Sequence, residues 1–117
     1  VVTTGLNYIA SRMKDAAATA MTHMALGSGT TTAAASQTDL VTLLGAREVL
    51  DSTTVTANAV AYVASFEAGD ATGAVTEAGI FNASSSGTML CRTVFSVVNK
   101  AADDTMTVTW TITLSAT

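Results

Sequence analysis

The residues of this chain that could do chemistry are few, and the histidine is the first of them. A hydrolytic triad needs a nucleophile, a base and an acid that orients the base. His23 is the only histidine and would have to be that base. It stands in the alternating run 21–26, which is typical of a strand. We therefore expect His23 to be a surface or half-buried strand residue rather than a catalytic base.

The single cysteine, Cys91, lies inside the strand-like stretch 88–99. A reactive thiolate prefers a helix N-terminus or a cationic pocket, and on a strand the neighbouring Arg92 points to the opposite face. We expect Cys91 to be a small buried hydrophobic residue. One Cys and one His cannot supply a four-ligand zinc site within one chain. A single Cys also forms no intrachain disulfide, which fits synthesis in a reducing cytoplasm.

Two acidic pairs fall in predicted loops, Glu67 with Asp70 and Asp103 with Asp104. They could bind calcium weakly if backbone carbonyls converged on them, but neither has the spacing of a known calcium loop. Turn formation is the simpler role for these aspartates. Glu77 has no second carboxylate beside it, so we expect a surface charge or a cross-strand partner.

The segment 27–29, Gly-Ser-Gly, is superficially similar to a phosphate-binding loop. It lacks the downstream Gly-Lys-Ser/Thr and the helix start that would supply backbone donors. None of the groups considered so far combines into a catalytic constellation. We therefore predict a protein that is not an enzyme, with no catalytic residue, no cofactor and no metal site.

The elements that would position these residues begin with one amphipathic helix. Its apolar positions recur at helical spacing, and Thr3 or Thr4 can serve as the N-cap. An alanine-rich run can extend it, so we expect a helix over about residues 4–18, ending near Ala18. The apolar positions are Leu6, Ile9, Ala10 and Met13.

Most of the remaining chain is expected to form six or seven short strands. Residues 27–35 are expected to form a loop or an ordered connector over the surface, and 67–76 a turn-rich segment. The leucines of 38–44 suggest one or two helical turns. The strands at 47–55 and 60–66 should pair with one another. The expected strands are 21–26, 47–55, 60–66, 78–82, 88–99 and 105–114.

The last two of these strands carry the clearest alternation. In 105–114 every second residue is a threonine and the residues between them are apolar, so one face should be buried. Trp110 is expected at the centre of the core rather than at an exposed binding surface, and Trp110→Ala should then cost roughly 3 to 5 kcal/mol. A hairpin loop of about five residues is the simplest connection between the two strands.

Many short strands separated by turns, together with one helix, predict a mainly β fold. We expect one domain over residues 1–117: a jelly-roll-like β-sandwich of short antiparallel strands with a short N-terminal helix. A partly open barrel is the alternative. The chain contains no proline, so its edge strands must be protected by another chain or by covering loops.

The amino-acid composition limits the kinds of partner that this chain can bind. Charged residues are 12% of the chain, against about 25% in typical globular proteins, and such a weakly charged surface favours association. The net charge of −4 and the scattered basic residues argue against a nucleic-acid or anionic-membrane surface. The apolar stretches are far shorter than the roughly 20 residues of a membrane-spanning helix. The N-terminus does not have the pattern of a secretory signal.

Four segments together resemble a known class of protein. They are 5–10 (GLNYIA), 22–30 (THMALGSGT), 77–82 (EAGIFN) and 87–95 (GTMLCRTVF). This combination resembles small virion proteins of tailed bacteriophages, in particular the cement (decoration) proteins on the outside of the head. The ALGSGTT stretch followed by EAGIFN is also similar to parts of phage tail and tail-fibre proteins.

The cement resemblance implies a jelly-roll domain that binds across neighbouring major capsid subunits and resists the pressure of packaged DNA. It implies the major capsid protein as partner, self-association as a dimer or trimer, and a place on the capsid exterior after synthesis in the host cytoplasm. A tail or tail-fibre adhesion module is the alternative, although the predicted loops lack the aromatic residues usual in host-binding modules. The apolar N-terminal arm supplies weak interface candidates, namely Val1, Val2, Thr3 and Thr4.

Overall fold

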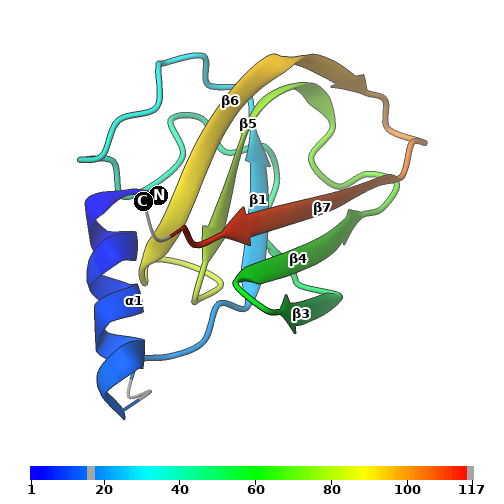
Figure 1. Ribbon diagram of the computed structural model, residues 1–117. Helices are drawn as coiled ribbons and strands as arrows, with labels where there is room; N and C mark the ends of the chain where they lie inside the picture. The colour runs from blue at the N-terminus through cyan, green and yellow to red at the C-terminus, as the bar shows by residue number, and fades with distance from the viewer. Residues whose placement is uncertain (16–17, 116–117) are drawn as a thin grey trace.

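The computed structural model describes residues 1–15 and 18–115. Within them one helix is followed by seven strands, which form two antiparallel sheets in the orders β2-β1-β5-β6 and β3-β4-β7 (Figure 1). The predicted mainly β sandwich with one short N-terminal helix is confirmed. The elements are α1 (Thr3–Asp15), β1 (His23–Gly27), β2 (Glu48–Val49), β3 (Ser52–Thr56), β4 (Ala59–Phe66), β5 (Gly73–Phe81), β6 (Met89–Lys100) and β7 (Met106–Thr113).

The four-stranded sheet buries both of its faces around β1 and β5. Strands β1 and β5 pair from His23 opposite Phe81 to Gly27 opposite Glu77. Because side chains alternate along a strand, Met24 and Ile80 lie on the inner face, in the core shared with the other sheet. Phe81 lies on the outer face, in a smaller cluster with Val2, Ala25, Leu40 and Met89. The second cluster is closed by the N-terminus and by the loop over residues 28–44.

The three-stranded sheet supplies the other half of the main core. Tyr62, Ala64 and Phe66 of β4 are buried, and the apolar side chains of β7 are half-buried against them, while its threonines face out. The predicted alternation is confirmed. Trp110, however, is half-buried and does not sit at the centre of the core. It lies on β7, an edge strand with a neighbour on one side only.

Helix α1 lies against β6, but only in part through the predicted apolar stripe. Gly5 approaches the carbonyl group of Leu90 so closely that a Cβ would stand 2.9 Å from the carbonyl carbon. Val2, Tyr8 and Ile9 pack inward. Of the predicted stripe, Ile9 therefore contacts the core, whereas Leu6, Ala10 and Met13 are exposed, Met13 by 82%. The expected extension over 16–17 lies outside the described residues, and Ala18 forms a bend.

The predicted helical turns over 38–44 are absent, and that prediction was wrong. Leu43 forms an isolated bridge with Gly27. The N–H groups of Val41 and Thr42 donate to the carboxylate of Glu77 instead of to helical carbonyls. A buried carboxylate therefore competes with local helix formation and holds this segment extended.

The predicted strand over 47–55 is two strands in different sheets. Strand β2 pairs with β1, whereas β3 pairs with β4 as expected. Between them the N–H of Leu50 donates to Thr22 and that of Asp51 donates to Val63. The chain thus changes sheets at 50–51, which an unbroken β-type sequence does not reveal.

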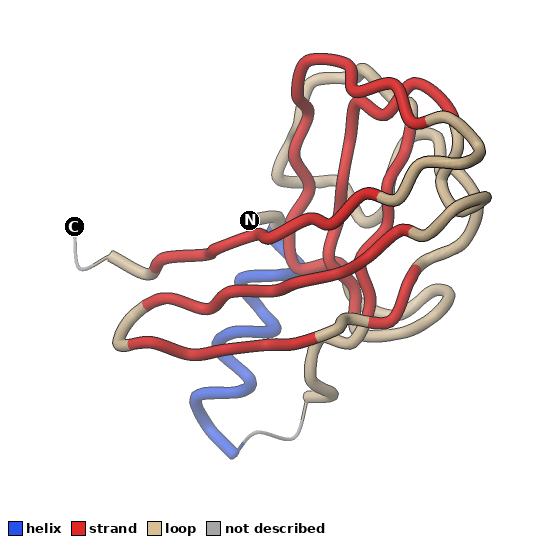
Figure 2. The backbone as a smooth tube through the Cα atoms, turned by 90° about the vertical axis from the view of Figure 1, so that its right-hand side faces the viewer, coloured by secondary structure: helices blue, strands red, loops and turns tan. Residues whose placement is uncertain are grey.

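The predicted hairpin between the last two strands is also wrong. Strand β6 pairs with β5, and β7 pairs with β4, so residues 101–105 cross from one sheet to the other. The carboxylate of Asp104 accepts the N–H of Ala101, which confirms the predicted turn-forming role. Figure 2 shows β3, β4 and β7 side by side, extending away from the other strands on the side of α1.

Candidate interaction surface

The β3-β4-β7 sheet carries no formal charge. Residues 52–66 and 105–115 include no Asp, Glu, Lys, Arg or His. Its outer face follows from the strand registers and presents hydroxyl and small apolar side chains. These are Ser52, Thr54, Thr56, Ala61, Val63, Ser65, Thr107, Thr109, Thr111 and Thr113. One carboxylate touches this face, because Oγ of Ser65 donates to Oδ2 of Asp51, just before β3. The strands themselves contribute no ionised side chain to the face.

Both edges of this sheet are open. Strands β3 and β7 each have one hydrogen-bonded neighbour, β4. All five residues of β3 are exposed. The turn between β3 and β4 has two residues, Ala57 and Asn58, and alternation along such a hairpin sends the backbone groups of Thr53 and Val55 away from β4. Lys, Pro and inward-pointing charges normally protect such edges, and β3 has none of these.

A second opening separates β6 from β7, where the two sheets are not hydrogen-bonded to each other. It is a groove of about 470 Å³. The β7 side includes Trp110, and the β6 side includes Phe95 and Val98, of which Val98 is exposed. The sandwich is therefore open along the β7 edge as well.

A buried ion pair fixes the loop 28–44 to the back of the four-stranded sheet. The carboxylate of Glu77 accepts Nε of Arg92 at 2.8 Å and the backbone N–H groups of Gly29 at 2.7 Å, Val41 at 2.9 Å and Thr42 at 2.8 Å. Burial by itself raises the pKa of Glu77, but these hydrogen bonds outweigh it and lower that pKa below its usual value. The predicted surface position is wrong, whereas the predicted cross-strand pairing is confirmed.

Arg92 extends the same network to the far side of the loop. Its Nη1 donates to the carbonyl of Thr31 at 2.9 Å and to Oε1 of Gln37 at 3.0 Å. Charge-assisted hydrogen bonds of this kind are stronger than neutral ones. The loop is therefore an ordered part of the domain, which agrees with the ordered connector expected as one alternative for residues 27–35.

Gly27 and Gly29 are required by the same carboxylate. A Cβ on Gly27 would stand 2.5 Å from Oε2 of Glu77, and a Cβ on Gly29 would stand 2.7 Å from Cβ of Val41. The ALGSGT and EAGIFN segments are thus neighbours in space, on β1 and β5. The two segments occur together because Gly27 and Gly29 of the first must leave room for Glu77 of the second. The Gly-x-Gly spacing in the sequence indicates this contact. The Gly-Ser-Gly segment 27–29, which is superficially similar to a phosphate-binding loop, donates the N–H of Gly29 to the carboxylate of Glu77.

The N-terminal candidates pack on their own domain. The N–H of Val2 donates to Leu90 and that of Thr3 donates to Ala35, while Oγ1 of Thr4 donates to Met89. Val2 is buried, and Val1 and Thr3 keep exposed side chains. The structure thus brings none of these four residues to the open sheet edges.

His23 and Cys91 occupy the positions expected of them. His23 is half-buried at the start of β1, and its Nδ1 lies 2.7 Å from Oγ1 of Thr22. Desolvation and the charge of Arg47 lower the pKa of His23. Cys91 is buried in the main core, and burial raises the pKa of its thiol to about 12. Among residues 1–15 and 18–115, no three His, Cys, Asp or Glu side chains are grouped so as to hold a metal ion.

The comparisons with known proteins were negative. No family model matches the chain, and no curated protein matches it. In the part of the chain that the structure describes, no helix is long and apolar enough to span a membrane. The fold and the uncharged, open-edged sheet therefore carry the functional argument.

Proposed function

We propose that this chain is a structural virion protein that binds the outside of a tailed-phage head and cements neighbouring major capsid subunits. The observation that carries the proposal is the β3-β4-β7 sheet, which has two open edges and no charged side chain between residues 52–66 and 105–115. The resemblance of its ALGSGT and EAGIFN segments to phage virion proteins supplies the phage assignment.

An open, uncharged edge is suited to permanent attachment. A partner strand that adds to β3 or β7 gains backbone hydrogen bonds, and alternate side chains supply specificity. The strands of this sheet contribute no ionised side chain. A partner that covers them away from Asp51, the carboxylate bonded to Ser65, therefore avoids the desolvation cost of burying charges. A stable contact needs roughly 1,000 Å² or more of buried surface, which the outer face and one edge together can offer.

The copy number of the chain in purified particles tests the assignment. Quantitative mass spectrometry of particles from a phage that encodes it gives the ratio to the major capsid protein. A ratio near one is expected, because the shell is the part of the particle with that many equivalent positions. A ratio of a few per cent would replace the head role by the tail-module alternative, and absence from particles would overturn both.

Edge variants test the surface itself. Thr54→Lys on β3 and Thr109→Lys on β7 introduce the charge that normally protects edge strands. Each side chain is exposed, so unfolding midpoints should stay unchanged while binding to expanded, undecorated capsids weakens at least tenfold for the edge in use. Ser85→Lys, in the exposed loop between β5 and β6, is the matched control. Full binding by both edge variants would contradict the proposed surface.

A further inference from the structure

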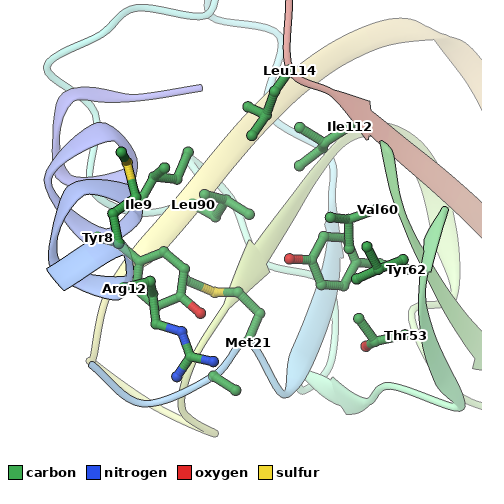
Figure 3. A pocket seen from close by; sticks show the side chains of 13 residues that line it. Tyr8, Ile9, Arg12, Met21, Thr53, Val60, Tyr62, Leu90, Ile112 and Leu114 are labelled. Carbon is green, nitrogen blue, oxygen red and sulfur yellow. The ribbon is translucent and has the colours of Figure 1, made fainter. Parts of the chain in front are cut away.

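An apolar groove separates α1 from the end of the β3-β4-β7 sheet (Figure 3). Its volume is about 410 Å³, within the range of roughly 300 to 1,000 Å³ typical of small-molecule sites. The helix forms one wall, the sheet forms the other, and β6 with the segment before β1 closes the base. It is lined by Tyr8, Ile9, Arg12, Met13, Ala20, Met21, Thr53, Val55, Val60, Tyr62, Leu90, Ile112 and Leu114.

The polar groups of this groove are dominated by donors. Tyr62 is 8% exposed, and its hydroxyl points from the sheet wall toward Met21 (Figure 3). That hydroxyl is not a fully buried atom without a partner, because in residues 1–15 and 18–115 Nη2 of Arg92 alone is such an atom. Burial raises the pKa of Tyr62, so the phenol keeps its proton at neutral pH and can donate. The hydroxyl lies at the groove, where it can donate to an acceptor from outside the chain.

The charge contributed by the described lining residues of this groove is positive. Among the lining side chains that the structure describes, Arg12 is the one that is charged, and Tyr8 adds a second phenol on the helix wall. No described Asp, Glu or His side chain lines the groove. Arg12 already donates to the carbonyl of Ala18 at 2.8 Å, but its positive charge still acts on the neighbourhood of Tyr62. An anionic group is therefore favoured there over a cationic one.

We propose that this groove is a binding site for an amphiphile with a straight apolar chain and a carboxylate head group, of the fatty-acid type. The carboxylate accepts the hydroxyl hydrogen of Tyr62 within the field of Arg12. The apolar chain lies between Ile9 and Leu90 on one side and Val60 and Ile112 on the other. This site goes beyond the cement role and does not rest on it, because ligand binding requires no capsid.

Three probes with equal chain length separate the head-group chemistry. Dodecanoate, dodecanol and dodecyltrimethylammonium are titrated into the full chain below their micelle concentrations and followed by calorimetry. Saturable binding of one dodecanoate per chain is expected, at least tenfold tighter than either of the other two. Equal affinity for the cationic probe, or uptake without saturation, would overturn the proposal.

Two variants locate the site. Tyr62→Phe keeps the ring and removes only the hydroxyl, so the fold should persist while dodecanoate binding weakens about tenfold. Dodecanol binding should weaken much less, because an alcohol oxygen is a weaker acceptor than a carboxylate. Ile112→Trp fills the groove and should abolish binding of all three probes. Thr111→Val, one residue away on the outer face, is the control. Unchanged dodecanoate binding in both groove variants would overturn the site, and so would a solution dimer that covers the groove and excludes the probes.

Discussion

Oε1 of Glu77 lies 2.8 Å from Nε of Arg92, and both side chains are inaccessible to solvent. The two residues stand on neighbouring strands of the four-stranded sheet, on the face away from the second sheet. Burying an ion pair seldom adds net stability, because both charges lose their hydration. Here the pair instead determines where a loop goes, since its remaining hydrogen bonds are made to backbone groups of residues 29–42 and to the side chain of Gln37.

Removing the arginine of this ion pair should strongly destabilise the folded protein. Arg92→Met leaves the carboxylate of Glu77 buried without its cation, a change that typically costs about 3 to 5 kcal/mol. The free energy of unfolding is measured by urea denaturation. Thr93→Ala, an exposed neighbour on the same strand, should change it by no more than about 0.5 kcal/mol. A loss no larger than that of the control would mean that the pair does not hold the loop.

Glu77 should make the fold sensitive to acid. Its pKa is lower in the folded state than in the unfolded chain, so its stabilising contribution is complete above the unfolded pKa of about 4.3. That contribution is lost as the pH falls through the lower, folded pKa. Glu77→Gln removes this titration. The difference in unfolding free energy between wild type and Glu77→Gln should therefore shrink as the pH is lowered below about 4, and a constant difference would contradict the assignment.

Glu48 should have the opposite pH dependence. Desolvation raises the pKa of Glu48, and the negative charges of Asp70, Glu67 and Asp51 raise it further. A carboxyl with a raised folded pKa favours folding when protonated, and that contribution is lost as the pH rises through the folded pKa. Glu48→Gln should therefore raise the thermal midpoint at pH 7 and leave it nearly unchanged at pH 4. Ser52→Ala, on the exposed start of β3, serves as the control.

The sequence predicts the parts of the fold that depend on local periodicity. Strands β4, β6 and β7 were placed within about two residues, because their alternation reflects which side chains face the core. The burial of Cys91 followed from the same alternation. The pattern also predicted that β3 and β4 pair, since a short turn leaves little choice of partner.

The sequence does not reveal contacts between distant segments. Alternation does not say which sheet a strand joins, so the crossing at 101–105 and the change of sheet at 50–51 were missed. The helix stripe was only partly right, because Gly5, not Leu6, sets the contact with Leu90. The burial of Glu77 was missed because its backbone donors lie 35 to 48 residues away along the chain. The groove likewise joins α1 to β3, β4 and β7, which are distant in sequence.

Gly29 is expected to tolerate no side chain. Its Cβ would stand 2.7 Å from Cβ of Val41 and 2.9 Å from Cδ of Glu77, and forcing a methyl group into a packed site typically costs about 1 to 3 kcal/mol. Gly29→Ala should therefore lower the free energy of unfolding and increase hydrogen exchange over residues 28–44. Ser28→Ala, on the neighbouring half-buried residue, should leave that exchange at the wild-type level. Equal exchange in both variants would show that the loop is held in some other way.

Truncation of Phe66 and truncation of Trp110, two aromatic side chains of the main core, should lower the free energy of unfolding by different amounts. Phe66 is fully buried, so Phe66→Ala should cost about 3 to 5 kcal/mol. Trp110 is half-buried on the β7 edge and lines the groove between the sheets, so less of its surface returns to water when it is truncated. Trp110→Ala should therefore cost less than Phe66→Ala, measured by urea denaturation of both variants side by side. The reverse order would place Trp110 at the energetic centre of the core and would mean that the β7 edge is covered in solution.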